Sequence, residues 1–298
     1  MKPLLLPLLL LPAIAFGSTP IDETRELAPD ARVSLDNLKG TIRVTVWDRS
    51  EIRLSGRLGE GTEGLEIRGD ARDLDVRIKY PEQSGWFGGW GSTRAGDSDL
   101  EVTLPAGVKL EVESVSAEID VRGIAGPSLS IENVSGDVHV ETAATEVSIE
   151  NVSGDQEVQA NSREARLETV SGEIRLRGSI SDRASLEAVS GSLTFESDAP
   201  LRSVTAGVVS GDVTLETRLA PGGRISAESL SGDVELVLPA DSSARLEASS
   251  FTGTIRSDQG SVEKAEHGPG SSLSVTLGSG DGKIELETFS GDLRVRMR

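Results

Sequence analysis

Histidine and serine are the first residues to consider for catalysis in this chain. His139 lies between Val138 and Val140, so strand alternation predicts that its side chain faces outward. His267 lies in the loop-like stretch "KAEHGPGSS". The serines of a recurring Ser-Gly pair have no recurrent histidine partner, and the chain contains no Gly-x-Ser-x-Gly nucleophile motif. We therefore predict turn-forming serines, no catalytic residue and no enzymatic activity.

Carboxylates recur at one position of an internal repeat. That position is occupied by Glu113, Glu132, Glu150, Glu168, Glu187, Glu228 and Glu287, with Gly207 as an exception. If the repeats stack about 5 Å apart, neighbouring charges repel by somewhat under 1 kcal/mol in water. Arginines such as Arg166, Arg175 and Arg294, or a divalent cation, could relieve this repulsion. Because the nonapeptide pattern of calcium-binding β-rolls is missing, we predict a solvated acidic face, with no metal site and no cofactor.

Large aromatic side chains are concentrated in one glycine-rich stretch, "YPEQSGWFGGWGSTRAGDSD", which runs from Tyr80 to Asp99. Rings on such a backbone suit stacking on sugars, insertion at a membrane interface, or a plug over an apolar flank of the fold. A disordered loop is the fourth alternative. If the chain has a ligand-recognition site, we predict that it includes Trp86, Phe87 and Trp90, because tryptophan is enriched at energetic hot spots.

Composition and the first residues restrict where the protein works. The chain has 298 residues, 3% aromatic residues, no cysteine and a net charge of −19, which would repel a nucleic-acid backbone. Residues 1–17 contain one lysine, a short apolar stretch and small residues, which is typical of a secretory signal peptide cleaved near Ala15 or Gly17. An uncleaved anchor is the alternative. We expect export to the periplasm or the extracellular space, and no membrane span after cleavage.

The repeat itself predicts the fold. "SIENVSGDVHV" begins at Ser130 and returns eighteen residues later as "SIENVSGDQEV", and its apolar positions are spaced by 2, 3, 4 and 2. We expect all of these positions, including the central one at Val134, to face inward, and the turn glycines to need positive φ. The central position recurs every 18 to 21 residues, and Phe289 lies 38 residues beyond Phe251, which suggests two further turns.

A β-sandwich built from successive hairpins would also give a repeat of 18 to 21 residues. Individual columns of glutamate, and of Ser, Asn or Thr beside it, are kept from copy to copy, and parallel coils would stack these columns. We therefore predict an all-β, single-chain parallel β-solenoid with coils of about 18–21 residues. It would span residues 31–298, with an aromatic Gly-rich loop at 81–98, after a lead-in at 18–30.

Three stretches carry a family resemblance: "VSLDNLKGTIRVTVWDRSEIRLSG", "LEVTLPAGVKLEVESVSAEIDV" and the repeated "VSGDV". Together they resemble the bacterial putative-adhesin family called domain of unknown function 4097, over roughly residues 31–298. The resemblance implies a β-helix in the cell envelope and offers no catalytic residues to transfer.

Three functions are compatible with this sequence. A non-catalytic envelope scaffold or adhesin-like protein that binds an envelope protein or glycan is favoured. A polysaccharide-active β-helix enzyme would need a cleft with clustered carboxylates and basic residues. The third alternative is a partner-binding component of envelope stress sensing.

Overall fold

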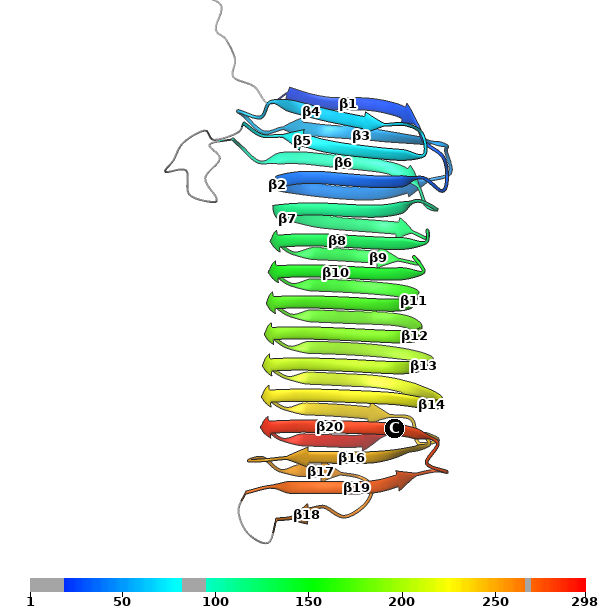
Figure 1. Ribbon diagram of the computed structural model, residues 1–298, viewed down its shortest axis with the longest axis vertical. Coiled ribbons are helices and arrows are strands. Elements are labelled where there is room, and N and C mark those ends of the chain that lie inside the picture. The colour runs from blue at the N-terminus through cyan, green and yellow to red at the C-terminus, as the bar shows by residue number, and fades with distance from the viewer. Residues whose placement is uncertain (1–18, 82–94, 266–268) are drawn as a thin grey trace, which may run out of the picture.

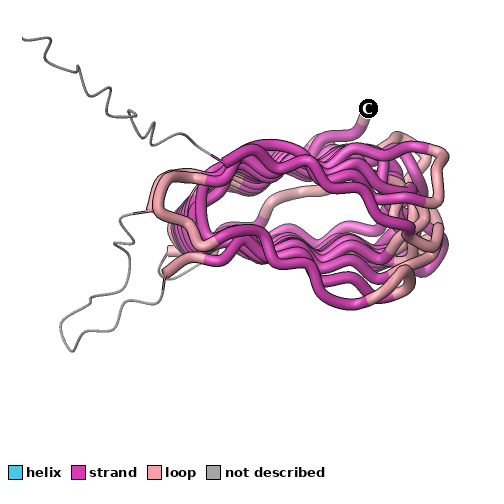
Figure 2. The backbone as a smooth tube through the Cα atoms, turned by 90° about the horizontal axis from the view of Figure 1, so that it is seen from above, coloured by secondary structure: helices cyan, strands magenta, loops and turns pink. Residues whose placement is uncertain are grey.

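The computed structural model describes residues 19–81, 95–265 and 269–298. In these residues the chain forms strands that stack into one elongated column (Figure 1), and the column has a flattened cross-section with two long walls (Figure 2). None of the described residues forms a helix long and apolar enough to cross a membrane. The predicted β-solenoid is confirmed. The predicted signal segment 1–17 lies outside the described residues.

The strands of the N-terminal half are β1 (Thr19–Glu26), β2 (Arg32–Trp47), β3 (Glu51–Leu58), β4 (Gly64–Gly69), β5 (Asp73–Lys79), β6 (Ser98–Pro105), β7 (Lys109–Ile124), β8 (Ser128–Ser135), β9 (Val138–Thr142) and β10 (Glu146–Ser153). Those of the C-terminal half are β11 (Gln156–Ser171), β12 (Ile174–Ser190), β13 (Leu193–Ser210), β14 (Val213–Ser231), β15 (Val234–Leu238), β16 (Ala244–Ser250), β17 (Ile255–Ser257), β18 (Glu263–Lys264), β19 (Ser271–Leu277), β20 (Gly282–Ser290) and β21 (Leu293–Met297).

Each central coil contributes one segment to each wall. The first half of β11 pairs in parallel with β9 on one wall, and its second half pairs in parallel with β10 on the other. We call the wall that contains β9 the first wall and the wall that contains β10 the second wall. Alternate side chains on both walls point inward, where Val, Ile and Leu fill a continuous core and Phe195 is fully buried. Stacked coils thereby bury the apolar edge that a single coil would expose.

The repeated Ser-Gly turn links the second wall of one coil to the first wall of the next. Gly172 has φ 141°, and a Cβ built there would lie 2.2 Å from the carbonyl oxygen of Gly154 in the preceding coil. The Gly154 amide in turn donates to the Ser171 carbonyl at 3.1 Å. Glycine is therefore required both for its backbone angle and for the close approach of successive coils.

The aspartate after the glycine also has a structural partner. Asp137 Oδ1 accepts the Asp155 amide of the next coil at 2.9 Å, and Asp155 Oδ1 accepts the Glu173 amide at 2.8 Å. Asp212 and Asp233 repeat this contact further along the column. The Ser-Gly-Asp motif thus joins one coil to the next, which accounts for its repetition without any catalytic role.

Chain order is interrupted at both ends of the column. Strand β20 pairs in parallel with β14 on one side and with β16 on the other, so the last coil is inserted between two earlier ones. The expectation that Phe289 lies two turns beyond Phe251 is wrong, because their rings stack with centroids 4.8 Å apart. At the other end, β2 pairs directly with β7, although β3 to β6 lie between them in the sequence.

Antiparallel strands close the two ends of the column. At the N-terminal end β1 pairs with β3 and β4 pairs with β5, and at the C-terminal end β19 pairs with β16 and β18. Strand β1 lies within the segment expected to be a lead-in. Strands β1, β4 and β19 therefore lie beyond the last parallel pairings and extend the column by antiparallel pairing.

Candidate binding surface

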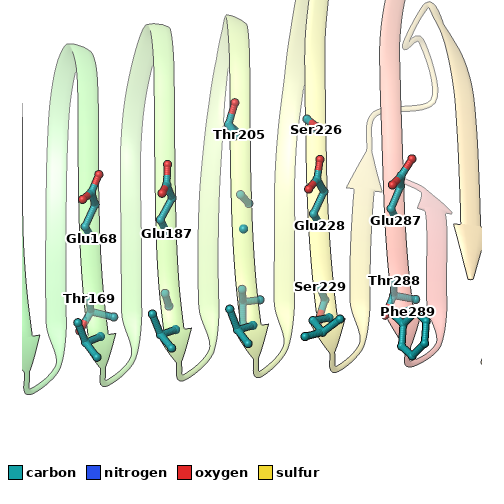
Figure 3. Close-up of a pocket in the computed structure, with 18 of the residues that line it drawn as sticks. Glu168, Thr169, Glu187, Thr205, Ser226, Glu228, Ser229, Glu287, Thr288 and Phe289 are labelled. Atoms are coloured by element: carbon teal, nitrogen blue, oxygen red, sulfur yellow. The ribbon is translucent and has the colours of Figure 1, made fainter.

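Two outward-facing columns run along the second wall, near the turns. The first contains carboxylates and the second contains apolar side chains, and they occur two residues apart on each strand. Both follow from strand alternation, since residues at i and i+2 share a face. We call the pair of columns the amphipathic strip. Figure 3 shows Glu168, Glu187, Glu228 and Glu287 in one row, with the strand that carries Thr205 between those of Glu187 and Glu228, and with Phe289 nearer the turns.

The carboxylate column is held by the parallel register. Its members are Asp36, Glu113, Glu132, Glu150, Glu168, Glu187, Glu228 and Glu287, each paired with the next except where Gly207 stands between Glu187 and Glu228. The structure thus stacks the glutamates that the sequence places in one column. Inserting β20 beside β14 brings Glu287 next to Glu228, although the two are far apart in the chain.

Few cations accompany this column. Asp36 pairs with Arg77 at 2.8 Å and Glu168 pairs with Arg166, while the salt bridges of the described residues include none of the other six. Arg175 pairs with Glu173 and Arg294 with Glu235, so neither relieves the column as the sequence suggested. The pKa of Glu113 is raised, chiefly by desolvation and then by the negative charges of Asp36 and Glu132. The column therefore carries unpaired negative charge.

The apolar column is more exposed than the sequence predicted. Its fully outward members are Val115, Val134, Val152, Val170, Val189, Val209, Leu230, Phe289 and Phe251, and their exposed fractions run from 44% at Val134 to 54% at Leu230. The expectation that this central repeat position faces inward is wrong. Val134 follows Ile131 by three residues, and an odd spacing places it on the opposite face of a strand. The odd spacing could have shown from the sequence alone that Val134 faces outward.

Polar side chains occupy the inward position between the two columns. Asn133 and Asn151 are 4% exposed, and the Asn151 amide nitrogen donates to the carbonyl oxygens of Gly136 at 3.0 Å and Gly154 at 3.3 Å. Thr288 makes the equivalent contact to Gly232 O at 3.1 Å. These inward amides and hydroxyls therefore donate to the turn carbonyls from inside the solenoid, while the side-chain oxygens of Asn133 and Asn151 have no hydrogen-bond partner within the described residues.

The amphipathic strip lines a shallow groove of about 1700 Å³ that extends from β2 to the region of β16 and β20. Tyr80 does not line the groove but packs against the core, where its hydroxyl donates to Asn37 Oδ1 at 2.8 Å and lies 3.2 Å from Ser98 Oγ. Burial is the main cause of the raised pKa of this phenol. Near β16 and β20 the stacked rings of Phe251 and Phe289 widen the apolar column.

The first wall differs in charge. A smaller hollow of about 200 Å³ there is lined by both signs, including Arg122, Arg175, Glu141 and Glu157. His139 faces outward as predicted, with Nε2 at 3.6 Å from a Glu157 carboxylate oxygen. The unpaired acidic charge and the exposed apolar side chains are thus concentrated on the second wall.

The other predicted functional residues do not join this surface in the described structure. Trp86, Phe87 and Trp90 lie outside the described residues, as does His267. Among the described residues, no group of three or more His, Asp or Glu side chains is arranged to hold a metal ion. Sequence reasoning found the glutamate column and missed the apolar one beside it.

Comparison with known proteins identifies the family. No curated protein matches the chain. Solved structures of a putative adhesin from Bacteroides fragilis and one from Parabacteroides distasonis are each 10% identical to it, with TM-scores of 0.41. These matches cover 94% of this chain and 97% of the first protein, and 95% of this chain and 98% of the second. The family model described as Toastrack DUF4097 matches residues 32–296, so the chain belongs to the Toastrack DUF4097 family.

Proposed function

We propose that this chain is an exported, non-catalytic binding protein of the cell envelope, and that the amphipathic strip is its binding surface. The observation that carries the proposal is the row of exposed Val, Leu and Phe side chains on a rigid wall. Contiguous apolar surface of this kind on a soluble fold marks a site of interaction, whereas isolated exposed apolar residues are ordinary. The stacked coils keep the row straight, so a partner would meet a preorganised surface.

The residues that line the groove also favour recognition over catalysis. Their titratable groups, among the described residues, are carboxylates and Lys264, all at or near the surface. The column glutamates project side by side from adjacent strands and do not converge on one point (Figure 3). A glycosidase needs two carboxyl groups that face each other across a sugar ring, which neighbouring members of a straight column do not provide.

Site-specific crosslinking tests this proposal. A photoreactive phenylalanine analogue replaces Val170 in the source cells, and a matched variant carries it at His139 on the first wall. We expect an adduct of defined mass from position 170 and none from position 139. The absence of an adduct at Val170, or equal adducts from both positions, would contradict the proposal.

Export is a separate part of the proposal. It rests on the signal-like sequence of residues 1–17 and predicts a mature chain that begins after Ala15 or Gly17. Mass spectrometry of the protein recovered from envelope and extracellular fractions measures its N-terminus. Recovery of the uncleaved chain in the cytoplasm would contradict export.

The aromatic stretch gives a further, independent proposal. Replacing Trp86 and Trp90 together by Ser should weaken binding of the crosslinked partner while moving the melting temperature by no more than a few degrees. A collapse in stability would indicate a plug that closes the solenoid. Unchanged binding with unchanged stability would leave these residues without either role.

A further inference from the structure

The dimensions of the amphipathic strip restrict what can bind along it. Ten strands, from β2 through β7, β8 and β10–β14 to β20 and β16, contribute to it. At about 4.8 Å between neighbouring strands, the strip is about 43 Å long. The apolar column is one side chain wide, so it fits a partner that presents a single narrow apolar stripe.

An α-helix matches the repeat of this column better than an extended chain does. A helix that lies along the column brings a new apolar side chain to the same face about every 5.4 Å, a mismatch of about 0.6 Å per turn against 4.8 Å. An extended chain does so about every 6.8 Å, a mismatch of about 2 Å per step. The apolar side chains of a helix therefore stay within half a strand spacing of their column positions for about four turns, or about 15 residues.

The charge of the strip determines the flank of that helix. The carboxylates lie on one side of the apolar column, two residues away along each strand, and six of the eight lack a salt bridge within the described residues. Lysine or arginine beside the apolar stripe of a helix would supply the missing cations. Long basic side chains also cover apolar surface with their stems while their charged ends reach the carboxylates.

A second copy of this chain fits the charge less well. Its apolar column would have the same spacing, but it would bring a second acidic column from a molecule whose net charge is −19. Like charges placed at an interface oppose association and slow encounter. Electrostatic complementarity therefore favours a basic partner over self-association.

We propose that the amphipathic strip binds a basic amphipathic helix, about four turns long, that lies along the solenoid axis with its apolar stripe on the valine column. This inference rests on the proposed function and names the class of partner. The valines supply apolar contact area, and the glutamates set orientation and favour cationic partners over anionic ones.

Three synthetic peptides of about 18 residues test the inference with the purified protein. The first is a helix former with leucine at i, i+3, i+4 and i+7 and lysine beside that stripe. The second has glutamate in place of lysine, and the third has the composition of the first in an order without a stripe. Fluorescence anisotropy measures binding at low and at high salt. We expect only the first peptide to bind, and more weakly as salt increases.

Protein variants localise the binding. Replacing Glu132, Glu150 and Glu187 together by Gln should weaken the first peptide by about tenfold, or about 1.4 kcal/mol, and reduce its salt dependence. The matched control replaces Glu141 and Glu157 on the first wall by Gln and should leave binding unchanged.

The valine column has its own variant. Replacing Val134, Val152 and Val170 by Ser should abolish binding of the first peptide without lowering the melting temperature by more than a few degrees, because these side chains are already half exposed.

Each contrary result has a defined meaning. Equal binding of the peptide without a stripe would show that net charge alone drives binding. Undiminished binding by the glutamine variant would show that the carboxylate column takes no part in it. Concentration-dependent dimers in light scattering, abolished by the valine variant, would favour self-association and overturn the inference. If the Val170 crosslink forms but no peptide binds, the helix inference fails and the proposed function stands. If neither the crosslink nor peptide binding is observed, both the inference and the proposed function fail.

Discussion

Replacing Gly172 by Ala tests the turn on which the column depends. The residue combines φ 141° with a Cβ position only 2.2 Å from Gly154 O, far inside van der Waals contact. Backbone strain of this kind costs about 1–3 kcal/mol, and the clash adds to it because the obstructing atom belongs to the backbone of the preceding coil and cannot rotate away. We expect a destabilisation of about 3 kcal/mol.

Two further glycines separate the causes of that loss. Gly222 has φ 72° with no atom within 4 Å of an added Cβ, so Gly222→Ala introduces strain alone, about 1–2 kcal/mol. Gly207 has neither a positive φ nor a close neighbour, so Gly207→Ala should be neutral or slightly stabilising. Ser171 is exposed, and Ser171→Ala should stay within about 0.5 kcal/mol of the parent.

Urea unfolding followed by circular dichroism ranks the four variants. With an m-value of about 3 kcal/mol per molar urea, Gly172→Ala should lower the midpoint by about 1 M. A changed slope would indicate that coils near the substitution unfold separately, as the quasi-one-dimensional contacts of a solenoid permit. Equal midpoints for Gly172→Ala and Gly207→Ala would refute the account of the turn.

Other variants probe the carboxylate column and the inward polar side chains. Because the folded-state pKa of Glu113 is raised, the native state binds protons more tightly than the unfolded state, and stability falls as pH rises above the ordinary carboxyl value of 4.5. Glu113→Gln should therefore be slightly stabilising at neutral pH and less so in high salt, as thermal melts at two pH values would measure; a loss of stability would contradict this. Asn151→Ala should cost about 1–3 kcal/mol in urea, since it removes the amide that donates to Gly154 O, whereas Gly136 O keeps the Asn133 amide at 3.3 Å; a neutral result would show that water replaces the lost donor. Calcium should not bind stoichiometrically at micromolar concentration, because it takes six to eight oxygen ligands and a straight column presents neighbouring carboxylates side by side; a tight calorimetric titration with a large rise in melting temperature would overturn this.

The repeat made the solenoid predictable, and it also concealed part of the arrangement. Every copy has the same strand pattern and the same turn, so each coil edge is complementary to every other edge. The sequence of such copies specifies stacking without specifying which coil stacks on which. The insertion of β20 between β14 and β16, and of β2 beside β7, depends on the intervening strands β16–β19 and β3–β6, which do not follow the repeat closely.

The binding surface was half predictable for a different reason. A glutamate in a strand can be predicted to face solvent, because a charged side chain is rarely buried without a partner. Valine occurs both inside and outside a strand. A column of valines is therefore taken for core unless its spacing from a known inward residue is checked to be even or odd. The inward residue beside Val152 is Asn151, a polar side chain whose amide nitrogen donates to the turn carbonyls.

Next to the turn, each coil has a polar side chain inside and an apolar side chain outside. The structure of the turn explains the inward polar residue but not the outward apolar one. Turn carbonyls near the wall need donors, which accounts for Asn, Ser or Thr inside. The turn does not require an apolar residue outside, although β-branched Val suits a strand and stacked cross-strand pairs contribute about 0.2–1 kcal/mol each. Val recurs there from Val115 to Val209 and is followed by Leu230, Phe289 and Phe251, each about half exposed. Neither the core nor the turn requires that column, which is why we propose that it contacts another molecule, and the unpaired glutamates beside it are the reason for proposing a cationic one.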